Sequence, residues 1–234
     1  MESPTLWLHN ICRKNGLQPT DHQLELLEHF VVFLLEWNRK VNLISRQDEN
    51  LVWQNHILHS ISPLFKLTLK AKPVVMDLGT GGGLPGIPLK ILLPESEFML
   101  VDSTKKKVNA LQDIVGRLSL RGVSALWCRA EDLVKEQNLL LHFDYIVARG
   151  VAPLNDLIAW SRPFLKPASL ELDEGGQAQV RPPALIALKG GELEDEIAKA
   201  KSRSKTRSIE VVDLVFPGSE EFSGPGKKVV IVHF

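Results

Sequence analysis

From Pro73 onward, short apolar runs alternate with helical patterns, and this alternation restricts the possible folds more than any other feature. The runs are rich in β-branched residues and read PVVMDL, EFMLVD, VSALWC, FDYIVA and ALIALK. Helices are predicted between them, at 86–93, 105–119, 153–165 and 191–202. Alternating strands and helices predict a mostly parallel sheet with helices on both faces, and continuously apolar strands suit such a doubly covered sheet.

Two further runs, IEVVDLVF and KKVVIVHF, close the sequence and break this pattern. Only the segment PGSEEFSGPG lies between them. A crossover between parallel strands needs about a dozen residues or more, so this last pair is predicted to be antiparallel. A seven-stranded, mostly parallel sheet that ends in an antiparallel hairpin is the α/β plan of class I (Rossmann-like) methyltransferases. It differs from the plan of nicotinamide dehydrogenases.

The first 70 residues have a different character. Residues 20–42 carry apolar side chains at the three-and-four spacing of an amphipathic helix, which Thr20 or Asp21 can cap. A second helical segment is predicted at about 48–60, and no strand is predicted before residue 70. We therefore expect a small helical lobe at 1–70 and a methyltransferase domain at 71–234.

Composition limits the classes of partner and compartment. The chain has 234 residues, and 28 basic side chains balance 28 acidic ones, so a nucleic-acid surface would have to be a local basic patch. Cys12 and Cys128 have neither metal-ligand spacing nor the number of a disulfide framework, so we predict no metal site. The sequence has no apolar stretch of about 20 residues and no signal-peptide pattern at its start. We expect a cytoplasmic protein that does not enter a membrane.

The segment GTGGGLPG, residues 79–86, follows the apolar run VVMDL and predicts a ligand-binding turn. Its spacing formally matches the dinucleotide fingerprint, whereas no Lys-Ser or Lys-Thr follows the glycines as in a P-loop. Asp77 favours a methyl donor, since a carboxylate can face a methionine amino group but repels a diphosphate. Gly79, Gly81 and Gly83 are expected to let the backbone approach the ligand, with Leu84 as an apolar wall.

Polar residues also follow the next strands. Asp102 ends one run and can accept both ribose hydroxyls, of S-adenosylmethionine or of NAD. Ala130 and Glu131, in CRAEDL, come after the next run, at the position where class I methyltransferases contact adenine. Arg149 follows DYIVA. Ligands of open parallel sheets bind at the carboxyl ends of the strands. Helix caps and plain tight turns remain the alternative for each position taken alone.

Six segments occur in the order found in one known family. They are WNRKVNLIS (37–45), NHILHS (55–60), DLGTGGGLPGIPL (77–89), LVDS (100–103), ARGVAPLNDL (148–157) and ALKG (187–190). With them the chain resembles the bacterial small-subunit (16S) ribosomal RNA guanine-N7 methyltransferases, also called glucose-inhibited division protein B or methyltransferase G. The resemblance covers nearly the whole chain, and the Leu-Pro-Gly-Ile-Pro extension is its most specific part.

This resemblance implies a class I methyltransferase domain preceded by a helical lobe, with S-adenosylmethionine as the methyl donor. It implies 16S ribosomal RNA, free or in the small subunit, as the substrate. The cofactor contacts that it implies fall on Gly79, Leu84, Asp102, Ser103, Thr104, Ala130, Glu131 and Arg149. Asp77 and Gly81 are added from the glycine turn itself.

The chain departs from the family in four places. The family usually has an acid at His59 and Ser or Thr at Ile44, and its SRA stretch reads ARG here, which keeps Arg149. Residues 171–183 resemble an insertion. None of these changes lies in the glycine turn. The change at His59 affects the contacts that the helical lobe is expected to make.

Guanine N7 has a lone pair and no proton, so methylation there needs alignment with the sulfonium methyl group and no general base. Arg149 and Lys189 are the candidates for the substrate side of the pocket. The alternative is that Arg149 pairs with a neighbouring acid and that Lys189 merely extends from a strand end.

Binding to RNA further requires phosphate contacts. The segment KAKSRSKTR (199–207) is one candidate and suits an extended basic stretch, with a solvated surface as its alternative. Lys105, Lys106, Lys107, Arg39, Lys40 and Arg46 are further candidates. Trp7, Trp37 and Trp53 are expected to pack in the core rather than to stack on bases.

Three other functions remain open on the sequence alone. The first is a methyltransferase for another substrate, such as a protein or a small molecule. The second is a nicotinamide-dependent oxidoreductase, which the position of Asp77 and the final hairpin disfavour. The third is a non-catalytic RNA-binding assembly factor that retains the fold.

Overall fold

The computed structural model of the chain describes residues 2–167, 180–224 and 226–234. Its centre is a seven-stranded sheet in the order β3-β2-β1-β4-β5-β7-β6. The strands are β1 (Val74–Leu78), β2 (Glu97–Asp102), β3 (Val123–Trp127), β4 (Tyr145–Arg149), β5 (Ala184–Gly190), β6 (Ser208–Asp213) and β7 (Lys227–His233). Strands β1 to β5 pair in parallel, whereas β7 is antiparallel to both β5 and β6. The predicted fold class and the antiparallel final pair are confirmed.

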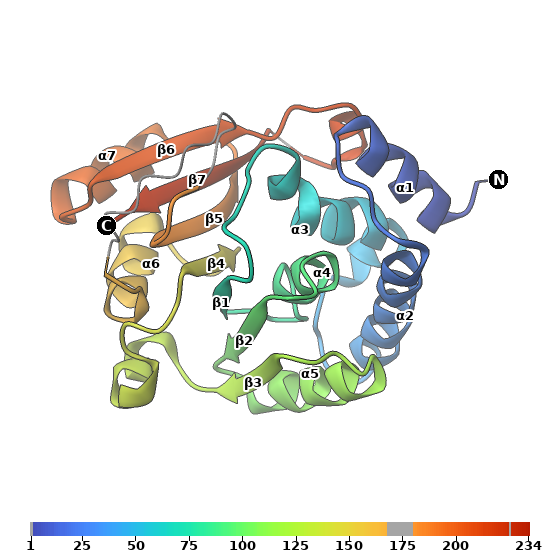
Figure 1. Ribbon diagram of the computed structural model, residues 1–234, viewed down its shortest axis with the longest axis horizontal. Coiled ribbons are helices and arrows are strands. Elements are labelled where there is room, and N and C mark those ends of the chain that lie inside the picture. The colour runs from blue at the N-terminus through green and yellow to red at the C-terminus, as the bar shows by residue number, and fades with distance from the viewer. Residues whose placement is uncertain (1, 168–179, 225) are drawn as a thin grey trace.

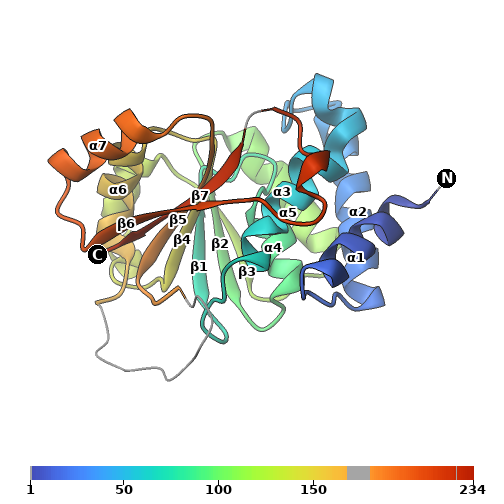
Figure 2. The same cartoon turned by 90° about the horizontal axis from the view of Figure 1, so that it is seen from above.

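Helices cover both faces of this sheet (Figures 1 and 2). On one face lie α4 (Gly86–Leu92) and α5 (Lys105–Arg117), together with the N-terminal helices. On the other lie α6 (Leu154–Ser161) and α7 (Glu194–Arg203). Each face has its own cluster of buried apolar side chains, so the strands are apolar on both sides, as predicted.

The N-terminal region is helical, as predicted, but contains one helix that the sequence pattern did not predict. This helix, α1 (Pro4–Lys14), begins with Ser3 as N-cap and Pro4 in its first turn, which is a recognisable start signal. The predicted long helix is α2 (Asp21–Asn38), capped by Thr20. The Thr20 hydroxyl accepts from the Gln23 backbone N–H at 3.2 Å, and the Gln23 side chain accepts from the Thr20 N–H at 2.9 Å.

A series of short helical elements connects α2 to the sheet. They are η1 (Arg46–Leu51), the π-helical η2 (Val52–Leu58), α3 (His59–Ile61) and η3 (Ser62–Phe65). In the second half of the chain, 3-10 turns follow β3 at η4 (Ala130–Lys135) and η5 (Gln137–Leu139), follow α6 at η6 (Arg162–Phe164) and precede β7 at η7 (Ser219–Glu221). The π-helical stretch η2 brings Asn55 and His56 to the site described below.

The N-terminal helices share one hydrophobic core with the sheet. Leu27 and Phe30 of α2 are fully buried in the same cluster as Leu111 of α5 and Ile231 of β7. Trp7, Trp37 and Trp53 pack against this cluster and are partly buried, as expected. The division at residue 70 stays a prediction, since the core is continuous across it.

Two expectations concern segments elsewhere in the chain. Most of the insertion expected at 171–183, up to residue 179, lies outside the described residues. Of the basic segment at 199–207, expected to be extended, the first half is helical because α7 continues to Arg203. Within the described residues, no helix has the length and apolar character needed to cross a membrane.

Candidate cofactor and substrate site

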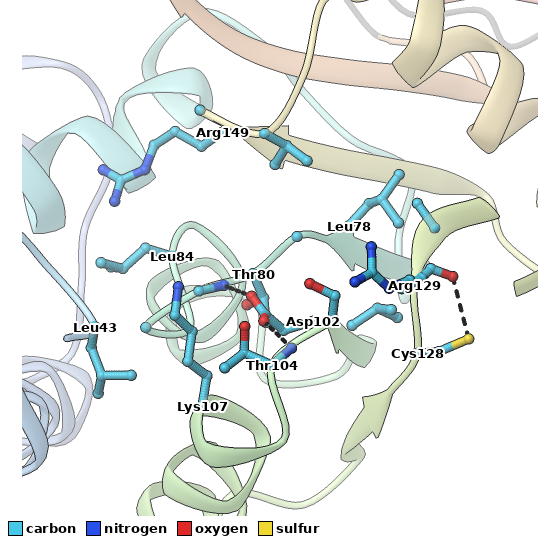
Figure 3. Close-up of a pocket in the computed structure, with 18 of the residues that line it drawn as sticks. Leu43, Leu78, Thr80, Leu84, Asp102, Thr104, Lys107, Cys128, Arg129 and Arg149 are labelled. Atoms are coloured by element: carbon cyan, nitrogen blue, oxygen red, sulfur yellow. Dashed lines mark hydrogen bonds between the residues drawn. The ribbon is translucent and has the colours of Figure 1, made fainter. Parts of the chain in front are cut away.

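A cavity of about 520 Å³ opens at the carboxyl ends of β1, β2 and β4 (Figure 3). This volume is within the usual range for small-molecule sites, and the position is the one that open parallel sheets use for ligands. Its walls come from the glycine turn, the end of β2, the segment after β3, the end of β4, and the loop between α2 and η1. The cavity is therefore lined both by the N-terminal helical region and by the strand ends of the sheet.

The glycine turn is shaped by backbone conformation and by packing. Gly79, Gly81 and Gly83 have positive φ angles of 71°, 58° and 84°, which disfavour other residues. A Cβ atom on Gly79 would lie 2.6 Å from the Val151 side chain, and one on Gly83 would lie 2.5 Å from Ile87. Among the described residues, no atom lies within 4 Å of a Cβ on Gly81. The backbone conformation of the turn thus favours glycine at these positions, and the close ligand approach that we expected stays a prediction.

Asp77 is fully buried next to the turn and is not among the residues that line the cavity, so its contact with a ligand amino group, or with a water bound to it, stays a prediction. Its Oδ2 accepts from the Thr80 hydroxyl at 2.7 Å and from the Gly86 N–H at 2.8 Å. Complete burial raises the pKa of this carboxyl to about 6, although both hydrogen bonds and the Arg149 charge oppose the shift. Asp77 ties the start of the turn to the first residue of α4.

Asp102 is the carboxylate that faces the cavity (Figure 3). Its Oδ2 accepts from the Gly81 N–H at 3.0 Å, and its Oδ1 accepts from the Thr104 N–H at 2.8 Å. Each oxygen keeps a further lone pair, so both can accept a hydroxyl of a bound ribose. Asp102 therefore holds the glycine turn against β2 and presents an acceptor pair to the ligand.

The segment after β3 forms the opposite wall. Cys128, Arg129, Ala130 and Glu131 belong to it, and Ser103, which follows β2, lines the cavity as well. Next to this wall, the half-exposed Trp127 indole donates to the Ser103 carbonyl at 3.0 Å, and the Lys105 ammonium lies 5.0 Å from its ring centroid. The wall combines apolar and polar groups, as a pocket for a heteroaromatic ring requires.

Arg149 ends β4, and its side chain reaches toward the N-terminal helical region (Figure 3). Its guanidinium donates to the Asn55 carbonyl at 3.2 Å and contacts His56 Nδ1 at 3.0 Å. Because a guanidinium has no acceptor, Nδ1 must be unprotonated, and the His56 proton is on Nε2. Nε2 lies 3.6 Å from the Asp48 carboxylate.

The electrostatics agree with a neutral His56. Burial, and next the charge of Arg149, lower the pKa of His56 to about 4. Burial also lowers the pKa of Arg149 to about 10, with the charges of Asp77 and Asp48 opposing, so Arg149 stays protonated at neutral pH. The result is a partly buried cation that is held by neutral acceptors and faces the cavity.

His59, where the family usually has an acid, lies buried near Arg149 and His56. Burial, and next the charge of Arg149, lower its pKa to about 3. Its ring contacts the Phe222 ring edge-on at 5.6 Å between centroids, and its Nε2 has no hydrogen-bond partner among the described residues. His59 is therefore neutral and cannot supply the negative charge of the family's acid.

Lys189 does not line the cavity. Its ammonium donates to the Ala152 carbonyl and to the Glu196 carboxylate, both at 2.8 Å, and it lies in a separate groove between α7 and the loop after β4. Glu196 also accepts from the Leu154 N–H. Lys189 thus fixes the loop that carries Val151, and its expected place on the substrate side of the pocket stays a prediction.

Nine of the predicted site residues line the cavity: Gly79, Gly81, Leu84, Asp102, Ser103, Thr104, Ala130, Glu131 and Arg149. The prediction missed Leu43, Ile44, Ser45, His56, Val151 and Trp160, which line it as well. Four of these belong to the segments WNRKVNLIS and NHILHS. Those motifs lay outside the expected methyltransferase domain, and their presence was the signal that the helical region contributes to the site.

Comparison with known proteins places the chain in one family. The family model described as rRNA small subunit methyltransferase G matches residues 23–222. The ribosomal RNA small subunit methyltransferase G of Chlorobium limicola is 42% identical over 82% of this chain and 79% of that protein. The protein of the same name from Parabacteroides distasonis is 40% identical over 91% and 84%.

Solved structures agree on the fold. A fibrillarin/Nop5p complex matches with a TM-score of 0.54 and 16% identity, covering 76% of this chain and 79% of that one. A predicted O-methyltransferase from Agrobacterium tumefaciens matches with a TM-score of 0.53 and 12% identity over the same shares. At this identity, the likeness concerns the arrangement of strands and helices alone.

Proposed function

Because the chain belongs to the rRNA small subunit methyltransferase G family, we propose that it transfers a methyl group from S-adenosylmethionine to N7 of a guanine in small-subunit (16S) ribosomal RNA. One observation carries the proposal: the cavity at the strand ends presents the Asp102 carboxylate beside a glycine turn. A carboxylate beside a glycine turn suits a nucleoside that carries a flexible amino-acid tail. The proposed substrate places the enzyme in the cytoplasm, where ribosomes are assembled.

The cofactor pose follows from the walls of the cavity. Asp102 would accept the ribose hydroxyls, Ala130 and Glu131 would lie against adenine, and the methionine part would extend along Gly79 and Gly81 toward Arg149. S-Adenosylmethionine supplies an electrophilic methyl group on sulfur, and the chain supplies the alignment. Since the buried Asp77 is beneath the turn, we assign it a role in holding the turn rather than the ligand.

The reaction needs no proton acceptor, and the site fits this requirement. Guanine N7 attacks the methyl carbon with its lone pair, the carbon–sulfur bond breaks, and neutral S-adenosylhomocysteine leaves. His56 is not free to act as a base, because its Nδ1 accepts from Arg149. Arg149 has further N–H donors and can orient guanine through O6. Lys189 is engaged with Glu196, so we assign it to the support of the neighbouring loop.

The test is transfer of a tritiated methyl group to undermethylated small subunits and to the RNA stripped from them, followed by nucleoside analysis. We expect labelled 7-methylguanosine from at least one of the two substrates. Label in protein or in a different nucleoside would contradict the proposal. Binding of S-adenosylmethionine without any transfer to either substrate would instead favour another substrate or an assembly factor.

A further inference from the structure

A second groove adjoins the cofactor cavity and has a strongly positive lining. It has a volume of about 710 Å³ and lies between the loop that follows α2 and the first turn of α5. Its cations are Arg39, Lys40, Arg46 and Lys107, and none of the described residues that line it is acidic. The chain as a whole has a formal net charge of zero, so this local excess is not a consequence of bulk composition.

The groove is continuous with the cavity that we assign to the methyl donor. Leu43, Ile44, Ser45 and Lys107 line both. The Lys107 side chain rises from α5 toward the space between Leu43 and the glycine turn (Figure 3). A strand lying in the groove can therefore deliver one of its bases to the cavity without crossing another part of the surface.

The backbone of the groove is built by a buried amide. Asn38, 5% exposed, accepts the Leu43 and Ile44 N–H groups on its Oδ1 at 2.7 and 2.9 Å. Its Nδ2 donates to the Glu49 carboxylate, and Glu49 is not among the residues that line the groove. Asn38 thus holds the loop that bears the cations against the end of α2.

The charges are also unpaired inside the protein. Among the described residues, none of the four groove cations forms an ion pair, and the Lys40 ammonium lies over the Trp37 ring, at 5.0 Å. Lys105, Lys106 and Lys107 occupy the first turn of α5, where the helix dipole disfavours cations and where that turn contains no acid. An anionic partner would offset the unfavourable charges at the start of α5 and would meet groove cations that no acid of the described residues engages.

We propose that this groove binds the phosphate backbone of the RNA strand that carries the target nucleotide. The inference rests on the function proposed above and deepens it by naming the RNA surface. It also distinguishes the two basic regions that the sequence suggested. The groove adjoins the cavity, whereas the segment at 199–207 forms the C-terminal end of α7 and the residues just after it.

The test compares two triple variants that remove equal charge. Arg39→Gln/Lys40→Gln/Arg46→Gln changes the groove, and Lys201→Gln/Arg203→Gln/Lys205→Gln changes exposed cations in the last turn of α7 and just beyond it. Binding of protein-free 16S ribosomal RNA is measured at several salt concentrations. For every phosphate that is no longer bound, the slope of log affinity against log salt should decrease by about 0.7 to 0.9. The slope of the groove variant should therefore fall by about 2, and its affinity should fall at least roughly 10-fold. The control should keep the wild-type slope.

Calorimetry with S-adenosylmethionine separates failure of this inference from failure of the proposed function. Arg39, Lys40 and Arg46 do not line the cofactor cavity, so the groove variant should bind the methyl donor like the wild type. An unchanged salt slope in the groove variant, or an equal loss in the control, would overturn the groove as the RNA surface. A wild-type protein that binds the donor but neither binds nor methylates RNA would overturn both proposals.

Discussion

The glycine-turn wall of the cavity, residues 79–86 with Asp102, is held together by neighbours in sequence, whereas the Arg149 wall joins segments 94 residues apart. On the first wall, the hydrogen bonds of Asp77 and Asp102 to the turn link residues at most 21 positions apart. On the second, Arg149 depends on Asn55 and His56, which belong to the N-terminal helical region. The first wall is a local motif that many chains can fold. The second exists only once the helical region has packed on the sheet.

This difference has a functional meaning. A local wall is suited to a ligand that is common to many enzymes, and the features of this wall match the methyl donor. The Arg149 wall and the basic groove next to it both include residues of the N-terminal helical region. We infer that donor binding depends on the first wall and that RNA selection depends on the second.

Removal of the Asp102 carboxylate should have the largest effect. In Asp102→Ala, the ribose loses its acceptors, and the Gly81 and Thr104 N–H groups lose theirs. We expect affinity for S-adenosylmethionine to fall at least about 100-fold, or about 3 kcal/mol, as measured by titration calorimetry. Asp132→Ala is the matched control, because that acid pairs with Lys135 outside the cavity and should leave affinity unchanged. Equal affinity in both variants would show that this wall does not hold the donor.

A methyl group at position 86 should disrupt the buried packing that supports the glycine-turn wall. Its Cβ would lie 2.6 Å from Asp77 Oδ2 and 2.6 Å from Leu100 Cδ2, both buried. Gly86→Ala should therefore lower the free energy of unfolding by about 2 to 3 kcal/mol, measured in urea. Gly116→Ala, in α5 with no described atom within 4 Å of its Cβ, should instead raise it by roughly 0.5 to 1 kcal/mol. A Gly86→Ala protein as stable as wild type would mean that Asp77 is free to move.

The same contrast explains what could be predicted from the sequence. Strand alternation and the short final connection predicted the sheet topology, since both depend on local pattern and chain length. Asp102 was predicted because it ends a strand, and Glu131 because it comes after the next strand, at the position where class I methyltransferases contact adenine. The hydrogen bonds of Asp77 to Thr80 and Gly86 were not predicted, because they depend on how the turn and α4 pack. His56 and Ile44 were missed because their contribution requires a long-range contact between two parts that were expected to be separate.

Protonation of His59 gives a pH test of the Arg149 wall. Its pKa is about 3 in the folded protein, mainly through burial, and about 6.5 when unfolded. Between these values only the unfolded state binds the proton, so the free energy of unfolding decreases as pH falls. From pH 6.5 to 5, the free energy of unfolding should fall by about 1.6 kcal/mol more in wild type than in His59→Leu, as measured by urea unfolding.

The raised pKa of Asp77, about 6, acts in the opposite direction. Between pH 6 and 3.8 the folded state holds the additional proton, so stability rises as pH falls. This contribution is present in both proteins and cancels in their difference. Parallel curves for wild type and His59→Leu would show that His59 is protonated in the folded state, and a titration of its ring by NMR near pH 6 would show the same.

Loss of His56 should have the smallest effect and tests whether it acts through Arg149. In His56→Ala, the guanidinium keeps the Asn55 carbonyl but loses the Nδ1 acceptor, so methyl transfer should fall roughly 10-fold, about 1.4 kcal/mol. His56→Asn, which can present an amide oxygen, should recover part of the rate. The double variant with Arg149→Ala should be no slower than Arg149→Ala alone, because a positioning residue has nothing left to position. If the rate losses of the two single variants instead multiply in the double variant, His56 contacts the substrate itself and the two residues do not form one wall.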